Sequence, residues 1–494
     1  MKYIPGLLFV LFIALIAFAC QDKQGQKDEL ASAGSGLNIA FNQFPPEDLD
    51  STATDTQLVN FAWEELIALN WKSSYSSNGK RDYPDTTWNW TKGDADTVVW
   101  ETFAHRTELR PASDTMQAFD NPPHYSFGSK LYPATVNGKP ASFMLFNNLD
   151  ENNEIGSCDV YAHVNQFQKQ YMVLYQAKVN RDEYQYIFDN YNTKAKLDAA
   201  TTKTKNNIKN HNAYYDSSTN TCNCPTDSGV VCLPCGGAEI PGMNGKTYQG
   251  AMEVKTAWRV LNPSVDDTTK FFTRKAIYYY AGKDGKIYYS NKTFGLIGIH
   301  IIHKTKNYPA FIFATWEHVD VQKDSMGYVL LDNGQETGPL IAPYTRLHPI
   351  PSLVDSSTSV VHNQIKGMNS NSVWLNYRLV GVQAKPTSDS TSFSFFLANF
   401  VIESDTTLAD FHGSSIGSPH DMGENILYKG QKYSGGGCQG CHGVAQMRLG
   451  TDFSFLLTSG LPVNSPDILN KPLLGQRPGG LSKFEFLKKI TANK

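Results

Sequence analysis

The sequence predicts an α+β protein, in which a large domain with a mixed, mainly antiparallel sheet and peripheral helices precedes a mostly helical C-terminal segment. Two observations predict this class. Apolar and polar residues alternate in several runs along the middle of the chain, a pattern typical of half-buried strands. Few long helical patterns separate these runs, so antiparallel pairing is favoured over parallel crossovers.

The composition indicates a globular protein without a nucleic-acid partner. Of the 494 residues, 40% are hydrophobic and 12% aromatic, which is sufficient for a sizeable core. The formal net charge is −3, and Lys and Arg are spread thinly along the chain. Such a distribution does not neutralise a phosphate backbone.

The N-terminus indicates export and a lipid anchor. Lys2 precedes a short apolar run over residues 4–19, as in a signal peptide that covers residues 1–19. The run ends with the small residues Ala17 and Ala19, and Cys20 follows, which resembles a bacterial lipoprotein signal whose cysteine receives lipid. The alternative is ordinary cleavage with Cys20 left as a thiol. We expect residues 20–46 to be a flexible tether to a bacterial membrane, in the periplasm or on the outer membrane or cell surface.

The predicted large domain covers residues 47–405. It opens with a helix over residues 57–71, whose apolar residues share one face, and Asp55 lies just ahead as a cap. Residues 251–260 read as a half-buried strand, and an Asp284-Gly285 turn joins two strand-like runs into a hairpin. The hairpin runs and the further expected strands are residues 275–281, 286–290, 142–146, 294–303, 309–318, 374–383 and 393–402.

Two long polar stretches, residues 72–97 and about 201–245, are expected to be surface excursions. The second carries four cysteines in a CxC-x7-CxxC arrangement: Cys222, Cys224, Cys232 and Cys235. They suit either a structural zinc site or two disulfides that staple an otherwise coreless loop, and export favours the disulfides. Cys158 is then left single.

The C-terminal segment, residues 406–494, carries a c-type haem motif and ends in a predicted helix over residues 482–490. Cys438 and Cys441 lie one helical turn apart and suit thioether bonds to a haem, and His442 follows directly as the proximal iron ligand. The alternatives are a disulfide between the two cysteines, a zinc site and a thiol redox pair. Zinc requires a fourth ligand, and a redox pair does not need His442.

The sixth ligand of such an iron is not evident near the motif. Met447 lies only five residues after His442, too close to wrap over the opposite haem face. Other candidates are Met422, His412 and His420 just upstream, and His300, His303 and His318 in the large domain. His303 and His318 share apolar strand faces, so both also suit a core role.

Several stretches resemble a poorly characterised family, the large bacterial cytochrome c proteins with one CxxCH near the C-terminus. They are residues 61–71, 98–103, 253–258, 295–305, 313–320, 397–403 and the haem motif. The resemblance implies export, a single haem and one large domain in front of it, without an established substrate. It adds weight to His300, His303, His318, Trp316 and Glu317 as haem-facing or pocket residues. The cysteine-rich excursion is not part of the family pattern.

These features predict a membrane-anchored cytochrome that transfers electrons to redox partner proteins. The large domain exceeds what a one-electron carrier needs. A second hypothesis is therefore a haem-dependent oxidoreductase, peroxidase-like or acting on a small molecule, whose large domain forms a substrate pocket. A third is a haem-based binding or sensing module.

Overall fold

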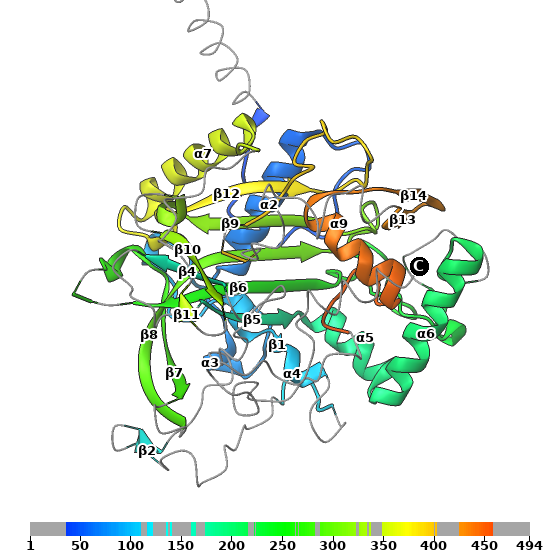
Figure 1. Cartoon of the computed structure of the whole chain (residues 1–494), viewed down its shortest axis with the longest axis horizontal. Coiled ribbons are helices and arrows are strands. Elements are labelled where there is room, and N and C mark those ends of the chain that lie inside the picture. The colour runs from blue at the N-terminus through cyan, green and yellow to red at the C-terminus, as the bar shows by residue number, and fades with distance from the viewer. Residues whose placement is uncertain are drawn as a thin grey trace, which may run out of the picture.

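The computed structural model describes residues 36–457, except for several internal stretches. Those stretches are residues 110–115, 122–134, 137–138, 141–159, 165–172, 216–221, 223, 262, 265, 282–286, 323–325, 333–334, 337–347, 400 and 403–423. The described part is an α+β fold with a mostly antiparallel sheet, as the sequence predicts (Figure 1).

A seven-stranded sheet forms the centre of the fold, with the strand order β1-β5-β6-β8-β9-β12 and β7 paired with β8 outside this path. Every pairing in it is antiparallel. The strands are β1 (Ala104–His105), β5 (Val173–Val179), β6 (Met252–Val260), β7 (Thr273–Ala281), β8 (Ile287–His303), β9 (Ile312–His318) and β12 (Tyr377–Gln383).

The predicted hairpin is confirmed, since β7 and β8 pair with Tyr279 opposite Tyr289. β8 runs without a break through two stretches that the sequence separates into two strands, 286–290 and 294–303. β6 is buried on both faces rather than half-buried, since Glu253 and Arg259 are buried as well, Arg259 against Asp266 and Phe271. The predicted strand at 142–146 and helix at 482–490 lie outside the described residues.

One face of the sheet packs against α2 (Asp55–Leu69) and α7 (Ser352–Met368). α2 begins with a capping box in which Thr54, rather than Asp55, is the cap and Gln57 reciprocates. The Trp63 indole donates a hydrogen bond of 2.8 Å to the Ser357 hydroxyl and so links the two helices. We call this side the α2 face.

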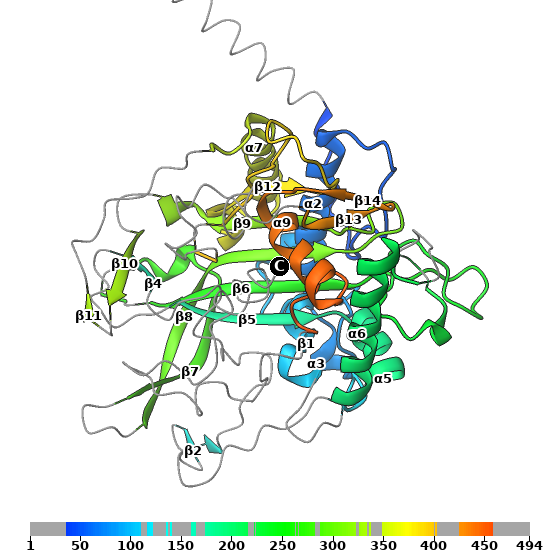
Figure 2. The ribbon, with the colours of Figure 1, turned by 45° about the vertical axis from the view of Figure 1, so that its right-hand side comes forward.

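The opposite face, here called the α9 face, packs against α5 (Arg181–Tyr191), α6 (Lys194–His211) and the C-terminal elements. The latter are β13 (Ile426–Tyr428), β14 (Gln431–Tyr433), α9 (Gly437–Val444) and a π-helical turn, η9 (Ala445–Leu449). Figures 1 and 2 both show α9 beside α6 at one end of the sheet. The C-terminal elements therefore share a core with the large domain.

Three expectations outside the regular elements need correction. Residues 36–46 of the predicted tether are part of the fold, since Ile39 is 3% exposed and joins the core under α2. The strand expected at residues 393–402 is not formed by its described residues, of which 393–396 and 401–402 form turns and Ser394 has a φ of 53°. The Asn399 amide in this segment donates to the Thr315 hydroxyl and the Trp316 carbonyl, so the segment covers the sheet rather than extending it. The polar stretch 72–97 is partly buried, because its tryptophans, among them Trp88, join the core under α2.

The remaining elements are short. A three-stranded sheet has the order β11 (Gln335–Glu336), β10 (Met326–Asp332) and β4 (Val160–Val164). Two further sheets have two strands each, the β13–β14 pair and the pair of β2 (Thr135–Val136) with β3 (Lys139–Pro140). The short helices are α3 (Tyr75–Asn78), α4 (Arg106–Leu109), η2 (Trp90–Lys92), η3 (Val99–Thr102), η5 (Thr226–Ser228), η6 (Thr268–Lys270), η7 (Val319–Gln322) and η8 (Val373–Asn376). Among the described residues, no helix has the length and apolar character needed to cross a membrane.

Candidate haem-attachment site

The CxxCH motif forms helix α9, which lies directly against the segment that covers the sheet. Gly437 has a φ of 61°, and a Cβ atom there would stand 2.7 Å from the Phe395 carbonyl oxygen and 2.8 Å from the Leu397 nitrogen. Glycine is thus required by both backbone conformation and space. The run of glycines ahead of Cys438 lets the helix approach the sheet closely.

Two buried amide side chains fasten α9 to the ends of β9 and β12. The Gln439 side-chain amide donates to the carbonyl oxygens of Ala310, Phe311 and Ala384 at 3.2, 3.1 and 2.7 Å. The Gln383 side chain accepts from the Gln439 backbone at 2.8 Å and donates to the Gly436 carbonyl at 3.0 Å. The position of the motif is therefore fixed by the large domain.

The His442 ring is oriented by a backbone carbonyl and by two aromatic rings. Its Nδ1 lies 2.6 Å from the Phe453 carbonyl oxygen. Phe313 and Phe455 make edge contacts with it at centroid distances of 5.0 and 4.9 Å. Because a carbonyl oxygen only accepts, Nδ1 carries the proton, and in the neutral ring Nε2 then carries the lone pair. This is the tautomer that ligates a metal through Nε2 while a second group orients the ring.

The two cysteines of the motif stay outside both disulfides of the described residues. The alternative of a Cys438–Cys441 disulfide is thus not formed. Cys438 is buried, with its Sγ 3.5 Å from the Leu397 carbonyl oxygen, and Cys441 is half-buried. Cys438 belongs to the apolar cluster on the α9 face, so a group bonded to it would lie against that cluster.

Two of the candidate distal histidines are core residues of the α2 face. His303 is buried; its Nδ1 pairs with Glu65, and its Nε2 lies 2.6 Å from the Gln249 carbonyl oxygen. His318 stacks on Phe271 at 4.1 Å. Both side chains lie on the opposite side of the sheet from α9, so their apolar strand faces correctly indicate a core role.

His300 lies on the α9 face. It stands three residues before His303, which places the two side chains on opposite faces of β8, and it shares its face with Ile302 of the cluster that holds Cys438. Burial, and next the charges on His442 and Lys255, lower the pKa of His300 to about 3. His300 is therefore neutral at pH 7, and it lies near enough to His442 for a charge on that ring to disfavour protonation of His300.

The other candidates near the motif fall outside this arrangement or outside the described residues. Met447 packs among Ile208, Tyr214 and Leu427. His412, His420, Met422, Cys20 and Cys158 lie outside the described residues.

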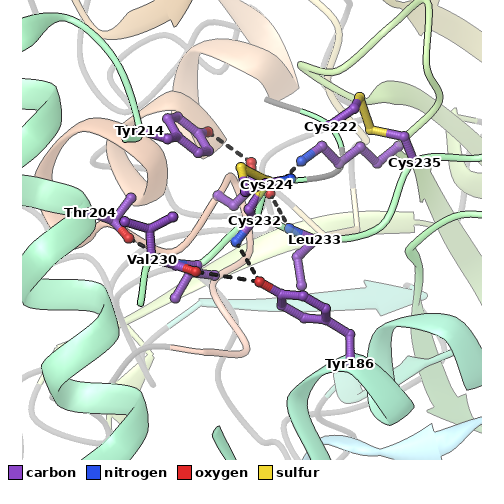
Figure 3. The surroundings of a disulfide bond; sticks show 12 residues. Tyr186, Thr204, Tyr214, Cys222, Cys224, Val230, Cys232, Leu233 and Cys235 are labelled. Atoms are coloured by element: carbon purple, nitrogen blue, oxygen red, sulfur yellow. Dashed lines mark hydrogen bonds and ion pairs between the residues drawn. A yellow bond between two sulfur atoms is a disulfide. The ribbon is translucent and has the colours of Figure 1, made fainter. Parts of the chain in front are cut away.

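The cysteine-rich segment forms two disulfides, Cys222–Cys235 and Cys224–Cys232, which confirms the favoured prediction and makes the zinc alternative wrong (Figure 3). Within the part of the chain that the structure describes, no three His, Cys, Asp or Glu side chains gather as metal ligands. The segment is also not coreless. Residues 201–211 belong to α6, and Val230, Val231 and Leu233 are buried.

Sequence reasoning missed two features of this region. Asp452, one residue before the carbonyl that binds His442, forms a buried ion pair with Lys304 at 2.5 Å. A cavity of about 320 Å³ lies beside α9, lined by apolar residues such as Val380 and Leu397 together with His348, which stacks on Phe396 at 3.8 Å. Neither has a periodic signal, because both join residues distant in the sequence.

No protein-family model, curated protein or solved structure matches this chain.

Proposed function

We propose that this chain is an exported c-type cytochrome that holds one haem and transfers electrons. Cys438 and Cys441 would form the thioether bonds, and His442 would be the proximal iron ligand. The observation that carries the proposal is the His442 ring, held through Nδ1 by the Phe453 carbonyl at 2.6 Å beside two cysteines on one helical turn. That tautomer presents Nε2, the nitrogen that ligates haem iron in this motif.

The surroundings of the motif suit a large apolar cofactor. Cys438 and its neighbours Leu397, Phe313 and Ile426 belong to one buried cluster. A bound haem supplies one-electron chemistry at iron, and a low-polarity shell of this kind tunes its potential. The protein's own contribution is to orient His442 through the Phe453 carbonyl.

The position of His300 favours electron transfer over a reaction at an iron with an open coordination position. It is the candidate distal histidine on the α9 face, it is buried, and it stays neutral at pH 7 because its pKa lies at about 3. A neutral imidazole is the form that ligates iron. We propose that His300 would be the sixth ligand of a bound haem iron, the arrangement that suits an electron carrier.

The cavity beside α9 favours the second candidate function, a haem-dependent oxidoreductase. Leu397 lines it, and the Leu397 carbonyl oxygen contacts the Cys438 sulfur at 3.5 Å. A small molecule in this cavity would lie beside the thioether edge of the cofactor, with His348 available for proton transfer.

Export and lipid anchoring complete the proposal. The signal-like residues 1–19 and Cys20 support it, as do two disulfides, which persist in oxidising compartments. The anchor would keep the haem near membrane-associated redox partners.

Mass spectrometry of the exported protein tests the central claim. The wild-type chain, made in a bacterium with the machinery for haem attachment, should carry the mass of one covalent haem. The Cys438→Ala/Cys441→Ala variant should lose it. A Gln431→Ala/Lys432→Ala variant changes two exposed residues just ahead of the motif and should retain it. Haem mass on the first variant, or its absence from the wild-type chain, would overturn the proposal.

A further inference from the structure

The carbonyl that orients His442 belongs to a turn with an unusual backbone. Asp452 and Phe453 have φ angles of 52° and 67°, in the left-handed region that side chains other than glycine rarely occupy. Two consecutive residues of this kind persist only where the surroundings hold them. The turn therefore depends on contacts outside itself.

The carboxylate of Asp452 supplies those contacts. Its Oδ1 accepts from the Tyr214 hydroxyl at 2.7 Å. Its Oδ2 accepts from the Leu233 backbone N–H at 2.7 Å and from the Lys304 ammonium at 2.5 Å. All four residues are buried, so every donor bonds this carboxylate instead of water. Asp452 is thus fixed from three directions.

The three donors come from separate parts of the fold. Lys304 directly follows β8, Tyr214 follows α6, and Leu233 lies in the disulfide-bonded segment between Cys232 and Cys235. Figure 3 shows the bonds of Tyr214 and Leu233 converging beside the Cys224–Cys232 disulfide. The cysteine-rich segment is therefore part of the support of the turn.

The same turn is tied back to the haem motif. Thr451 donates from its backbone and hydroxyl to the Ala445 carbonyl at 3.2 and 3.1 Å. Gln446 donates to the Tyr214 hydroxyl at 3.0 Å, so the group that binds Asp452 also contacts η9. These bonds hold the turn in which the Phe453 carbonyl faces His442.

We propose that Asp452 is a positioning residue, which sets the electron donation of His442 by fixing the Phe453 carbonyl at Nδ1. A strong hydrogen bond from Nδ1–H makes the imidazole a better donor at Nε2. A better donor stabilises oxidised iron over reduced iron and lowers the reduction potential. This inference rests on the proposed haem attachment.

The reduction potential of holoprotein variants tests it. Asp452→Asn removes the charge that holds Lys304, and Tyr214→Phe removes one donor and leaves the ion pair in place. Both variants should raise the reduction potential. For Asp452→Asn we expect about a tenfold increase in the ratio of reduced to oxidised protein, which is about 59 mV for one electron. The NMR signal of the His442 Nδ1 proton should move and exchange faster with water in both.

Asp266→Asn is the matched control, because it breaks another buried ion pair. The side chains of Arg259 and Asp266 are 4% and 5% exposed, and this pair does not contact the turn. It should leave the potential and the His442 signal unchanged. Unchanged values in Tyr214→Phe and in any folded Asp452→Asn would overturn the positioning role while haem attachment stands. A wild-type chain without covalent haem would overturn both claims, and mass spectrometry separates the two results.

Discussion

His300 and His303 lie three residues apart on β8 and face opposite sides of the central sheet. His303 bonds Glu65 and the Gln249 carbonyl on the α2 face, whereas His300 shares the α9 face with the cluster that holds Cys438. One strand therefore supplies a structural histidine to one layer and a candidate iron ligand to the other.

Replacing His300 by Ala should convert a six-coordinate low-spin haem to a high-spin form that binds carbon monoxide. The physical reason is the loss of the neutral imidazole on the α9 face. Absorption spectra of the reduced protein with and without carbon monoxide measure it. His362→Ala is the control, since His362 is a partly buried histidine on α7 that bonds the Tyr377 carbonyl. An unchanged low-spin spectrum in His300→Ala would exclude this residue as a ligand.

Replacing His303 by Leu should lower the free energy of unfolding by about 3–5 kcal/mol, because it leaves Glu65 buried without its ion-pair partner. Burial raises the pKa of Glu65, and the charge on His303 opposes that rise. The double variant Glu65→Leu/His303→Leu should recover much of the loss. Guanidinium unfolding measures all three chains, and equal destabilisation of the single and double variants would contradict the prediction.

Stability should decrease as pH falls from about 6.5 to about 4 because of His318. Burial lowers the pKa of His318 to about 4, against the influence of the Lys270 carbonyl and Asp320. The unfolded chain therefore binds a proton in this interval that the folded chain does not. His318 contributes about 3 kcal/mol to the decrease. His318→Phe should flatten the curve in denaturant titrations across pH, and exposed His211→Phe should not.

A buried pair of carboxyl groups should have the opposite pH dependence. Burial, and next the neighbouring Glu253 carboxylate, raise the pKa of Glu183 well above its ordinary value. The folded chain thus retains a proton there, and stability is lost as pH rises from about 4.3 through the folded pKa. Glu183→Gln should stabilise the protein at alkaline pH and have little effect at pH 4. Equal effects at both pH values, or the same gain from exposed Glu239→Gln, would refute this.

The sequence predicted the parts of the fold that carry a periodic pattern. The alternation in β6 and the hairpin of β7 and β8 are visible because strand pairing imposes them locally. The apolar face of α2 is visible for the same reason, although its cap was misplaced by one residue. The apolar pattern of residues 393–402 predicts a strand that is not formed. Its cause is that Phe395 and Leu397 are buried against glycines of α9 and β12.

The residues of the candidate site that are adjacent in the chain were predictable from the sequence. The residues that folding brings together from distant positions were not. Cys438, Cys441 and His442 stand together in the chain. The buried pair of Asp452 and Lys304 spans 148 residues, and no spacing rule connects such positions. Likewise, alternation along β8 places His300 and His303 on opposite faces of the sheet. The local sequence does not show which of the two faces packs against α9.

The support of the Phe453 carbonyl also bears on the order of biogenesis. Tyr214, Leu233 and Lys304 all precede the motif, the nearest of them by more than a hundred residues, so a chain made from its N-terminus presents these anchors before Cys438 emerges. Under the proposed haem attachment, the turn that closes beside His442 would meet anchors that are already made, so attachment of the cofactor would be a late step in the folding of the chain.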